Sequence, residues 1–273
     1  MSDFHTFVDG APAASIPVFD RGLAYGHGLF ETMRLSGGSL PLWSLHRERL
    51  ARGLELLGIP LAVETIDVQL RSCLARLPGD GVIKLIVTGG VGARGYAPLG
   101  DTPGSTIIQW MPVPLSMPSV ALYPCRYRLP DNPVLAGVKH LNRLDQVLAA
   151  AEVPSGFQGL VMDSRDNVVE AVSHNLFCRI DGQWYTPVLN NCGVAGVMRH
   201  YLMSEVFPDL GMSVREVALS VDELASAQEA FLSNAVHGIV PVIAIDGVKQ
   251  WITGAETRQV QQRLADLHNC FGA

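Results

Sequence analysis

Three prolines fall within eight residues near the middle of the chain, in the stretch Met111-Pro-Val-Pro-Leu-Ser-Met-Pro118. Proline fixes one backbone dihedral angle and has no amide hydrogen, so neither a helix interior nor a central strand can pass through this stretch. We therefore predict an interdomain linker at residues 112–118. It would separate a smaller N-terminal α+β domain, residues 1–111, from a larger C-terminal domain, residues 119–273.

The hydrophobic patterns on both sides of this linker predict an α+β fold. Before it, we expect a hairpin over residues 30–42, a helix that begins near Ser44 and ends at Gly58, and strands at 82–88 and 105–110. After it, we expect helices near 142–152 and 196–207 and a last helix capped by Thr253, with short strands between them. Asn142 is the expected N-cap of the first of these helices.

Composition and charge narrow the class of protein. The 273 residues are 48% hydrophobic, and 20 Lys and Arg against 26 Asp and Glu give a net charge of −6, which argues against a broadly basic nucleic-acid-binding surface. Apolar stretches end well before the ~18 residues of a membrane span, and the N-terminus lacks the pattern of a secretory signal. The five cysteines are far apart and form no CxxC pair, so we expect no metal site and a reducing, cytoplasmic location.

Among the residues that can carry chemistry, Lys139 stands between an apolar extended stretch and a predicted helix start. A lysine in such a place should be at least partly desolvated, which favours the neutral, nucleophilic amine. From the residues alone, a lysine whose amine reaches solvent is the more common outcome. The histidines have no metal-ligand spacing, so we interpret them as structural.

Two further features are compatible with a cofactor that has a phosphate and a ring nitrogen. Glycines at positions 193 and 196 precede a predicted helix start, where free amide groups favour a phosphate. Glu170 ends the apolar strand Val168-Val169-Glu170, where a carboxylate needs a cationic partner such as a pyridinium N–H. Each signal is weak alone, and together they suggest pyridoxal 5'-phosphate (PLP).

The chain resembles the fold-type IV PLP-dependent enzymes, the class IV aminotransferase-like family with the fold of D-amino-acid aminotransferase. Within this family it is most similar to the aminodeoxychorismate lyase branch, and the resemblance extends nearly end to end. The lysine block, Lys139-His-Leu-Asn-Arg143 followed by an acid and Gln, is its most specific part. The other carriers are Asp20–Gly22, Tyr25–Glu31, His46–Leu50, Gly92–Tyr96, Val169-Glu170, Asn175–Phe177 and Gly193–Arg199.

The resemblance implies roles for three charged side chains. Lys139 matches the lysine that binds PLP covalently and then moves protons. Glu170 matches the carboxylate that bonds the pyridine nitrogen. Arg49 matches the arginine that holds the phosphate.

It also implies further contacts, some through the backbone. The amides of Val197 and Met198 match the helix start on the same phosphate. Ala235 stands where branched-chain aminotransferases carry a phosphate-binding threonine, so only its amide is available, which agrees with the lyase branch. Arg94, in the Gly92–Tyr96 turn, is the candidate for a substrate carboxylate.

The implied activity is that of a carbon–oxygen lyase of folate biosynthesis, which converts 4-amino-4-deoxychorismate to 4-aminobenzoate and pyruvate. The implied assembly is a homodimer that acts on a small molecule, without a nucleic-acid or membrane partner. A branched-chain or D-amino-acid aminotransferase of the same fold is the alternative, because it would share Lys139, Glu170 and Arg49. A non-catalytic PLP-carrying or partner-binding protein is the other.

Overall fold

The computed structural model describes residues 5–92, 94–97, 100 and 102–272. The chain divides into two compact units, with Met1–Pro114 and Val138–Asn142 in unit 1, and Leu115–Gly137 and Arg143–Ala273 in unit 2. The main division falls between Pro114 and Leu115, within the proline-rich stretch. We expected Lys139 in the C-terminal domain, but its segment groups with unit 1. The reason is backbone pairing: the amide of Phe30 donates to Lys139 O at 3.0 Å, and that of Leu141 donates to Gly28 O at 2.9 Å.

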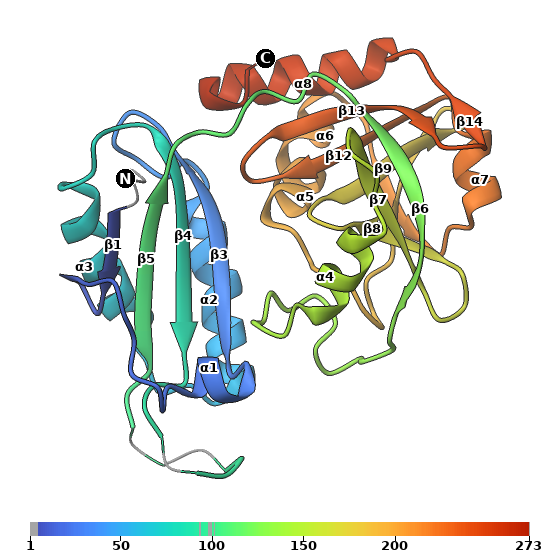
Figure 1. The fold of residues 1–273 in the computed structure, drawn as a ribbon. Coiled ribbons are helices and arrows are strands. Elements are labelled where there is room, and N and C mark those ends of the chain that lie inside the picture. Colours follow the sequence, from blue (N-terminus) through green and yellow to red (C-terminus); the bar gives the residue numbers. More distant parts are fainter. Residues whose placement is uncertain (1–4, 93, 98–99, 101, 273) are drawn as a thin grey trace. The chain divides into compact units, whose positions relative to one another are not determined.

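Unit 1 is an antiparallel sheet with helices against one face (Figure 1). Buried and less buried residues alternate along β3, which places Leu29, Met33 and Leu35 in the core. The sheet order is β2(Ala11–Pro12)-β1(His5–Val8)-β5(Ser105–Met111)-β4(Gly81–Thr88)-β3(Gly28–Leu35), and the helices are α1(Arg21–Tyr25), α2(Trp43–Leu57) and α3(Val63–Leu74).

The expected hairpin over residues 30–42 is wrong in its second half. β3 ends at Leu35, the glycine turn is closed by one bridge between Ser36 and Ser39, and the chain then enters α2. The partner of β3 is β4, in a register that places Glu31 opposite Leu85. The glycine turn is therefore formed, but β3 pairs with the distant strand β4 rather than with the residues that follow the turn.

Unit 2 is a nine-stranded mixed sheet with helices α5 and α8 against β12 and with α4 against β6 and β7 (Figure 1). Asp181 and Gly182, both at positive φ, form the expected turn between β9 and β10. The strands follow the order β11(Val214–Val217)-β10(Gln183–Pro187)-β9(Asn175–Ile180)-β12(Glu229–Asn234)-β13(Gly238–Ile245)-β6(Val120–Leu129)-β7(Phe157–Asp163)-β8(Val168–Ala171), with β14(Lys249–Gln250) on β13. The helical segments are α4(Leu144–Ala151), α5(Val197–Tyr201), the π-helix η1(Leu202–Val206), α6(Phe207–Asp209), α7(Val221–Ser226), α8(Ala255–Leu267) and the 3₁₀ turn η2(Asn269–Phe271).

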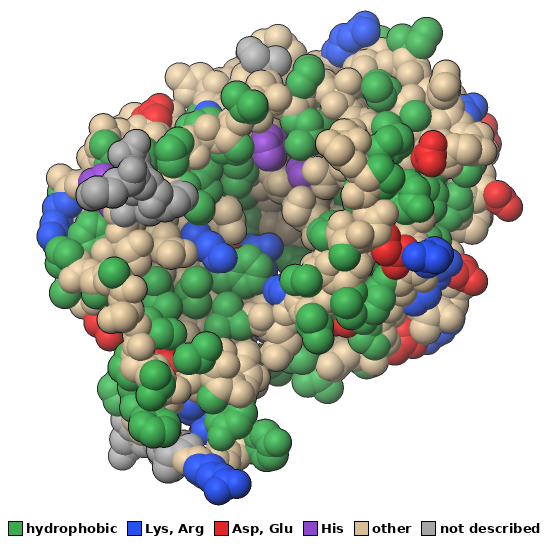
Figure 2. Space-filling view, viewed as in Figure 1, with side chains coloured by type: hydrophobic (Ala, Val, Ile, Leu, Met, Phe, Trp, Pro, Cys, Tyr) green, Lys and Arg blue, Asp and Glu red, His purple; other side chains and the backbone are tan. Residues whose placement is uncertain are grey.

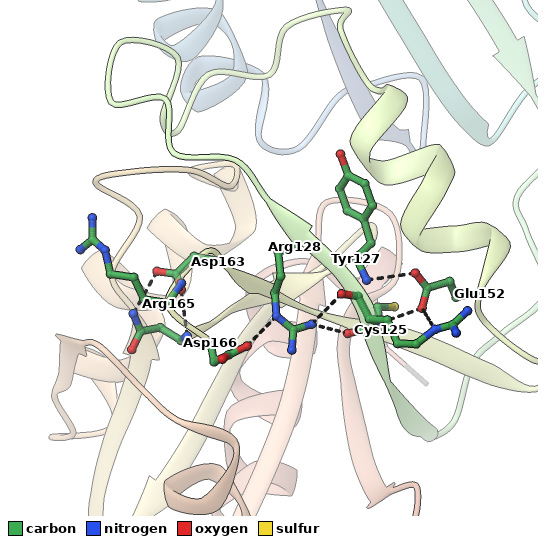
Figure 3. A network of polar contacts seen from close by, with 9 residues as sticks. Cys125, Tyr127, Arg128, Glu152, Asp163, Arg165 and Asp166 are labelled. Carbon is green, nitrogen blue, oxygen red and sulfur yellow. Dashed lines mark hydrogen bonds and ion pairs between the residues drawn. The ribbon is translucent and has the colours of Figure 1, made fainter.

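An irregularity in β6 anchors the helix that follows the lysine segment. The register between β6 and β7 shifts between Pro124 and Arg128, so this stretch leaves the regular ladder. Glu152, just after α4, accepts the amides of Arg126 and Tyr127 at 2.7 and 2.9 Å (Figure 3). These bonds lower the pKa of Glu152, with the Arg126 amide as the largest cause. The end of α4 is thereby fixed to the shifted strand.

Two helix starts differ from their expected caps. The N-cap of α4 is Arg143, and Asn142 instead donates its side-chain amide to Gly26 O at 3.1 Å. The N-cap of α8 is Gly254, one residue after Thr253. At α4, the contact of Asn142 with Gly26 removes the expected cap, and at α8, the distant Glu229 accepts the first-turn amide of Thr257 at 2.8 Å.

Among the described residues, no helix has the length and apolar character needed to cross a membrane. Within the same residues, no group of His, Cys, Asp and Glu could hold a metal ion. Figure 2 shows basic and acidic side chains at separate places on the face viewed, with hydrophobic and polar groups between them. On this face they form no continuous surface of one sign.

Candidate active site

Lys139 is partly buried and lies over an aromatic ring of unit 1. Its Nζ is 4.5 Å from the centre of the Phe30 ring, and the backbone of its segment pairs with β3. A second lysine, Lys84 on β4, lies over the same ring at 5.7 Å. The expectation that Lys139 is partly desolvated agrees with this position.

Arg49 lies on α2, where it pairs with a buried carboxylate on β3. Its Nε donates to Glu31 Oε1 at 2.9 Å, and its Nη2 donates to Glu31 Oε2. His46, three residues earlier on the same helix, places Nδ1 at 2.6 Å from Oε2. Glu31 is 1% exposed and His46 is 2% exposed, so this cluster is inside unit 1.

The pKa values of this cluster follow from burial and from its charges. Burial alone would raise the pKa of Glu31, but Arg49 and His46 overcome it and lower the value to about 2. Burial lowers the pKa of His46, the Glu31 carboxylate opposes that effect, and the positive charges of the Arg49 guanidinium and the Lys139 ammonium add to it. The Lys139 amine is thus electrostatically coupled to the cluster that holds Arg49.

Arg94 lies on an exposed turn of unit 1. The next three residues are held by a buried arginine, because Arg21 donates to the carbonyls of Gly95, Tyr96 and Ala97 at 3.2, 2.6 and 3.3 Å. The predicted contact of Arg94 with a substrate carboxylate stays a prediction.

In unit 2, Glu170 lies on β8 and is 4% exposed. Its Oε2 accepts the amide of Val194 at 3.0 Å and the side-chain amide of Asn175 at 3.5 Å. Asn175 also donates to Val194 O at 2.8 Å. The glutamate is therefore hydrogen-bonded to a backbone amide of the loop that leads to α5 and to a side chain of β9.

The amides of Val197 and Met198 are the first two of α5, and this helix has Gly196 as its N-cap without a side-chain cap. First-turn amides have no acceptor within the helix, so they are suited to bind an anion. A Cβ at Gly196 would lie 2.0 Å from Asn175 Oδ1, so glycine is required there. Ala235 lies in the turn between β12 and β13, two residues after Ser233, which pairs with Asn175.

The predicted residues thus form two groups, Lys139, Arg49 and Arg94 in unit 1 and Glu170, Val197, Met198 and Ala235 in unit 2. The residues of each group fit PLP. In unit 2, the buried carboxylate is the acceptor that a pyridinium N–H requires, and the uncapped helix amides are the donors that a phosphate requires. Unit 1 supplies a partly buried lysine amine and a fixed guanidinium.

Sequence reasoning assigned no role to three residues of these clusters, Glu31, His46 and Asn175, although each lies in a segment that carries the family resemblance. Glu31 had a usable signal, because it occupies an apolar position of the alternation in β3, which is the argument applied to Glu170. His46 follows from it as the histidine one helical turn from Arg49. Asn175 had no such signal, since its partner Val194 is 19 residues away.

Comparisons with known proteins agree with this arrangement. The family model of class IV amino-transferases matches residues 28–245. Aminodeoxychorismate lyase of Vibrio harveyi is 33% identical, over 94% of this chain and 98% of the relative. A crystal structure of 4-amino-4-deoxychorismate lyase from Pseudomonas aeruginosa superposes with a TM-score of 0.91 at 44% identity, over 96% of this chain and 98% of the other.

A D-alanine aminotransferase of Staphylococcus aureus is 27% identical, over 91% of each chain. The similarity therefore extends to both activities of the family and is higher for the two lyases. The α+β fold is that of fold-type IV enzymes, and members of this family use PLP. The chain belongs to the class IV aminotransferase family of PLP-dependent enzymes.

Proposed function

We propose that this protein is a PLP-dependent carbon–oxygen lyase that converts 4-amino-4-deoxychorismate to 4-aminobenzoate and pyruvate. The observation that carries the proposal is the 44% identity to a 4-amino-4-deoxychorismate lyase over 96% of the chain, in a structure with a TM-score of 0.91. An aminotransferase would share Lys139, Glu170 and Arg49, so these residues support the cofactor and leave the reaction open.

All of the predicted residues except Arg94 would help to hold the cofactor. Lys139 Nζ would bind it covalently, and the Glu170 carboxylate would hold a proton on the ring nitrogen. Arg49 and the amides of Val197, Met198 and Ala235 would bind the phosphate. When bound, PLP withdraws electrons from the carbon that carries the substrate nitrogen.

The chemistry asked of the chain is then one proton transfer. With substrate bound, the Lys139 amine would act as the general base that removes the proton from the amino-bearing ring carbon of the substrate. The bond from the adjacent carbon to the enolpyruvyl oxygen would then break and the ring would become aromatic, while the leaving enolate would take up a proton from water and tautomerise to pyruvate. Aromatisation drives the step, so no amino acceptor is needed. Arg94 is the proposed contact for a substrate carboxylate.

We also propose that the protein acts as a cytoplasmic homodimer. An exposed apolar surface of unit 1 supports this assembly, and it is formed by Val18, Phe19, Leu23, Val91 and Tyr96, at 74, 70, 63, 44 and 84% exposure. Backbone contacts join its parts, because Asp20 bridges to Val91 and the Gly92 amide donates to Phe19 O. Exposed apolar patches of this kind are typical of protein–protein interfaces.

The test is product analysis without a keto acid. The PLP-loaded protein is incubated with 4-amino-4-deoxychorismate, and 4-aminobenzoate and pyruvate are measured. The proposal predicts both products in equal amounts. Amino transfer from a branched-chain or D-amino acid to a keto acid, with no 4-aminobenzoate formed, would favour the aminotransferase. A protein that binds PLP and performs neither reaction would favour a non-catalytic role.

A further inference from the structure

Glu31 occupies a position of unit 1 where a carboxylate is costly. It lies on the core face of β3 between Leu29 and Met33, opposite Leu85 on β4, and is 1% exposed. A buried carboxylate is tolerated only when its oxygens are paired with donors. Its partners therefore determine what the residue does.

All three described contacts of Glu31 come from donors on α2. Arg49 approaches side-on, with Nε on one oxygen at 2.9 Å and Nη2 on the other. A side-on pair of this kind fixes the plane of the guanidinium as well as its position. His46 Nδ1 is 2.6 Å from the oxygen that also receives Nη2.

His46 adds a hydrogen bond without adding a charge. Burial is the largest influence on its pKa and lowers it, so the imidazole is neutral near pH 7 and carries its proton on the nitrogen that faces the carboxylate. The cluster then contains one anion and one cation. The histidine holds the carboxylate, and the carboxylate holds the arginine.

We propose that Glu31 is a positioning residue that, with His46, holds the Arg49 guanidinium in the orientation in which it binds the cofactor phosphate. This inference rests on the role of Arg49 in the proposed function. An arginine that is already oriented loses less side-chain entropy on binding, so its contact with phosphate is stronger.

The substitution Glu31→Gln tests this role, because glutamine has one oxygen and one NH₂ where glutamate has two oxygens. If the NH₂ replaces Oε1, it meets the Nε donor of Arg49, and if it replaces Oε2, it meets the Nη2 donor. Either orientation places a donor against a donor and breaks the side-on pair. The volume of the side chain is kept.

The experiment measures the dissociation constants of PLP and of pyridoxal, which lacks the phosphate, for the cofactor-free full-length protein. The ratio of the pyridoxal constant to the PLP constant isolates the contribution of the phosphate, and it falls when the phosphate contact weakens. We expect Glu31→Gln to lower this ratio about ten-fold, with the pyridoxal constant changed less than two-fold. Arg49→Ala should lower the ratio at least as much, and the double variant should add little to it.

The matched control is Asp67→Asn. It removes a carboxylate charge from another arginine of the same helix, Arg47, whose Nε is 3.0 Å from Asp67. The control should keep the ratio of the wild type. If Glu31→Gln does not fold, Arg49→Lys takes its place as the test. Lysine keeps the charge but lacks the planar guanidinium, so the ratio for this variant should be close to that for Arg49→Ala.

Equal weakening of PLP and pyridoxal by Glu31→Gln would show a structural role only and overturn the proposal, as would unchanged constants. A wild-type ratio in Arg49→Lys would also overturn it. If Arg49→Ala itself leaves the ratio unchanged, Arg49 does not bind the phosphate, and the failure lies in the site assignment beneath the inference. Conversion of 4-amino-4-deoxychorismate is measured separately and decides the proposed reaction.

Discussion

Glu31 and Glu170 are both buried glutamates on strands, at 1 and 4% exposure, and the hydrogen bonds described for them come from different kinds of donor. Glu31 receives the guanidinium of Arg49, a cation of the same chain. Glu170 receives the amide of Val194 and the carboxamide of Asn175, which are neutral. A carboxylate paired side-on with an arginine is suited to orient that arginine, whereas amide donors fix the position of a carboxylate. The partners of a buried acid, rather than its burial, therefore indicate its function.

Both glutamates are assigned to the binding of a cofactor that Lys139 would hold covalently, so loss of Lys139 should have the largest effect. General acid–base catalysis contributes ~10²–10⁴-fold, and Lys139 is also the proposed covalent attachment. We expect Lys139→Ala to lower turnover by about 10³-fold or more in a steady-state assay. Lys84→Ala is the control, since Lys84 lies over the same Phe30 ring at 5.7 Å and should be dispensable for turnover. The reverse pattern would assign the chemistry to Lys84.

Glu170→Gln tests whether the negative charge of Glu170 is needed for the reaction. Glutamine keeps the volume and an oxygen for the Val194 amide but removes the charge that stabilises a protonated ring nitrogen. If about 3 kcal/mol of transition-state stabilisation is lost, turnover falls about a hundred-fold, with little change in PLP affinity. Single-turnover kinetics at saturating PLP measures this. A wild-type rate would show that Glu170 has no part in the proton transfer.

Arg49→Ala tests whether the arginine that Glu31 holds binds the cofactor phosphate. Charge-assisted hydrogen bonds to phosphate contribute roughly 1.5–3 kcal/mol, so PLP affinity should fall about ten- to a hundred-fold. Turnover of the loaded fraction should stay close to that of the wild type. Titration of the cofactor-free protein with PLP, followed by assays at saturation, separates the two quantities. Unchanged affinity would assign the phosphate to other groups.

The pairing of Glu31 with Arg49 should also be visible in acid. Burial would raise the pKa of Glu31, but Arg49 and His46 lower it to about 2, against an ordinary value of 4.5. A lowered folded-state pKa gives stability that is complete above pH 4.5 and is lost as the pH falls toward 2.

Between pH 6 and 3, the free energy of unfolding of the wild type should therefore fall by roughly 2 kcal/mol more than that of Glu31→Gln. Urea unfolding of both proteins over this range measures the difference. Parallel curves would show that Glu31 is not held as an anion by its partners.

Much of the fold follows from local sequence. The β-branched stretches near 82–88 and 105–110 are β4 and β5, and Asp181-Gly182 is a turn, because side-chain alternation and positive φ are local properties. Local patterns failed where distant contacts decide. The chain after Gly38 forms no second strand because β3 pairs with β4, and Asn142 leaves the helix cap for a carbonyl 116 residues away.

The candidate site divides in the same way. Lys139 and Glu170 were identified because each is a charged residue next to an apolar stretch, which is a local signal. Unit 1 contains the lysine segment through backbone pairing with β3, which no pattern near residue 139 indicates. Asn175 is an uncharged residue whose importance appears only when the loop at Val194 folds against it.

The central question is which amine carries the cofactor, since the proposed roles of Arg49 and Glu170 both presuppose PLP bound at Lys139. The sequence contains three lysines, at positions 84, 139 and 249. We would load the protein with PLP, reduce it with borohydride and map the labelled peptide by mass spectrometry. We expect the loaded protein to be yellow before reduction and to keep one pyridoxyl group, on Lys139, after it. A label on Lys84 or Lys249 would contradict it.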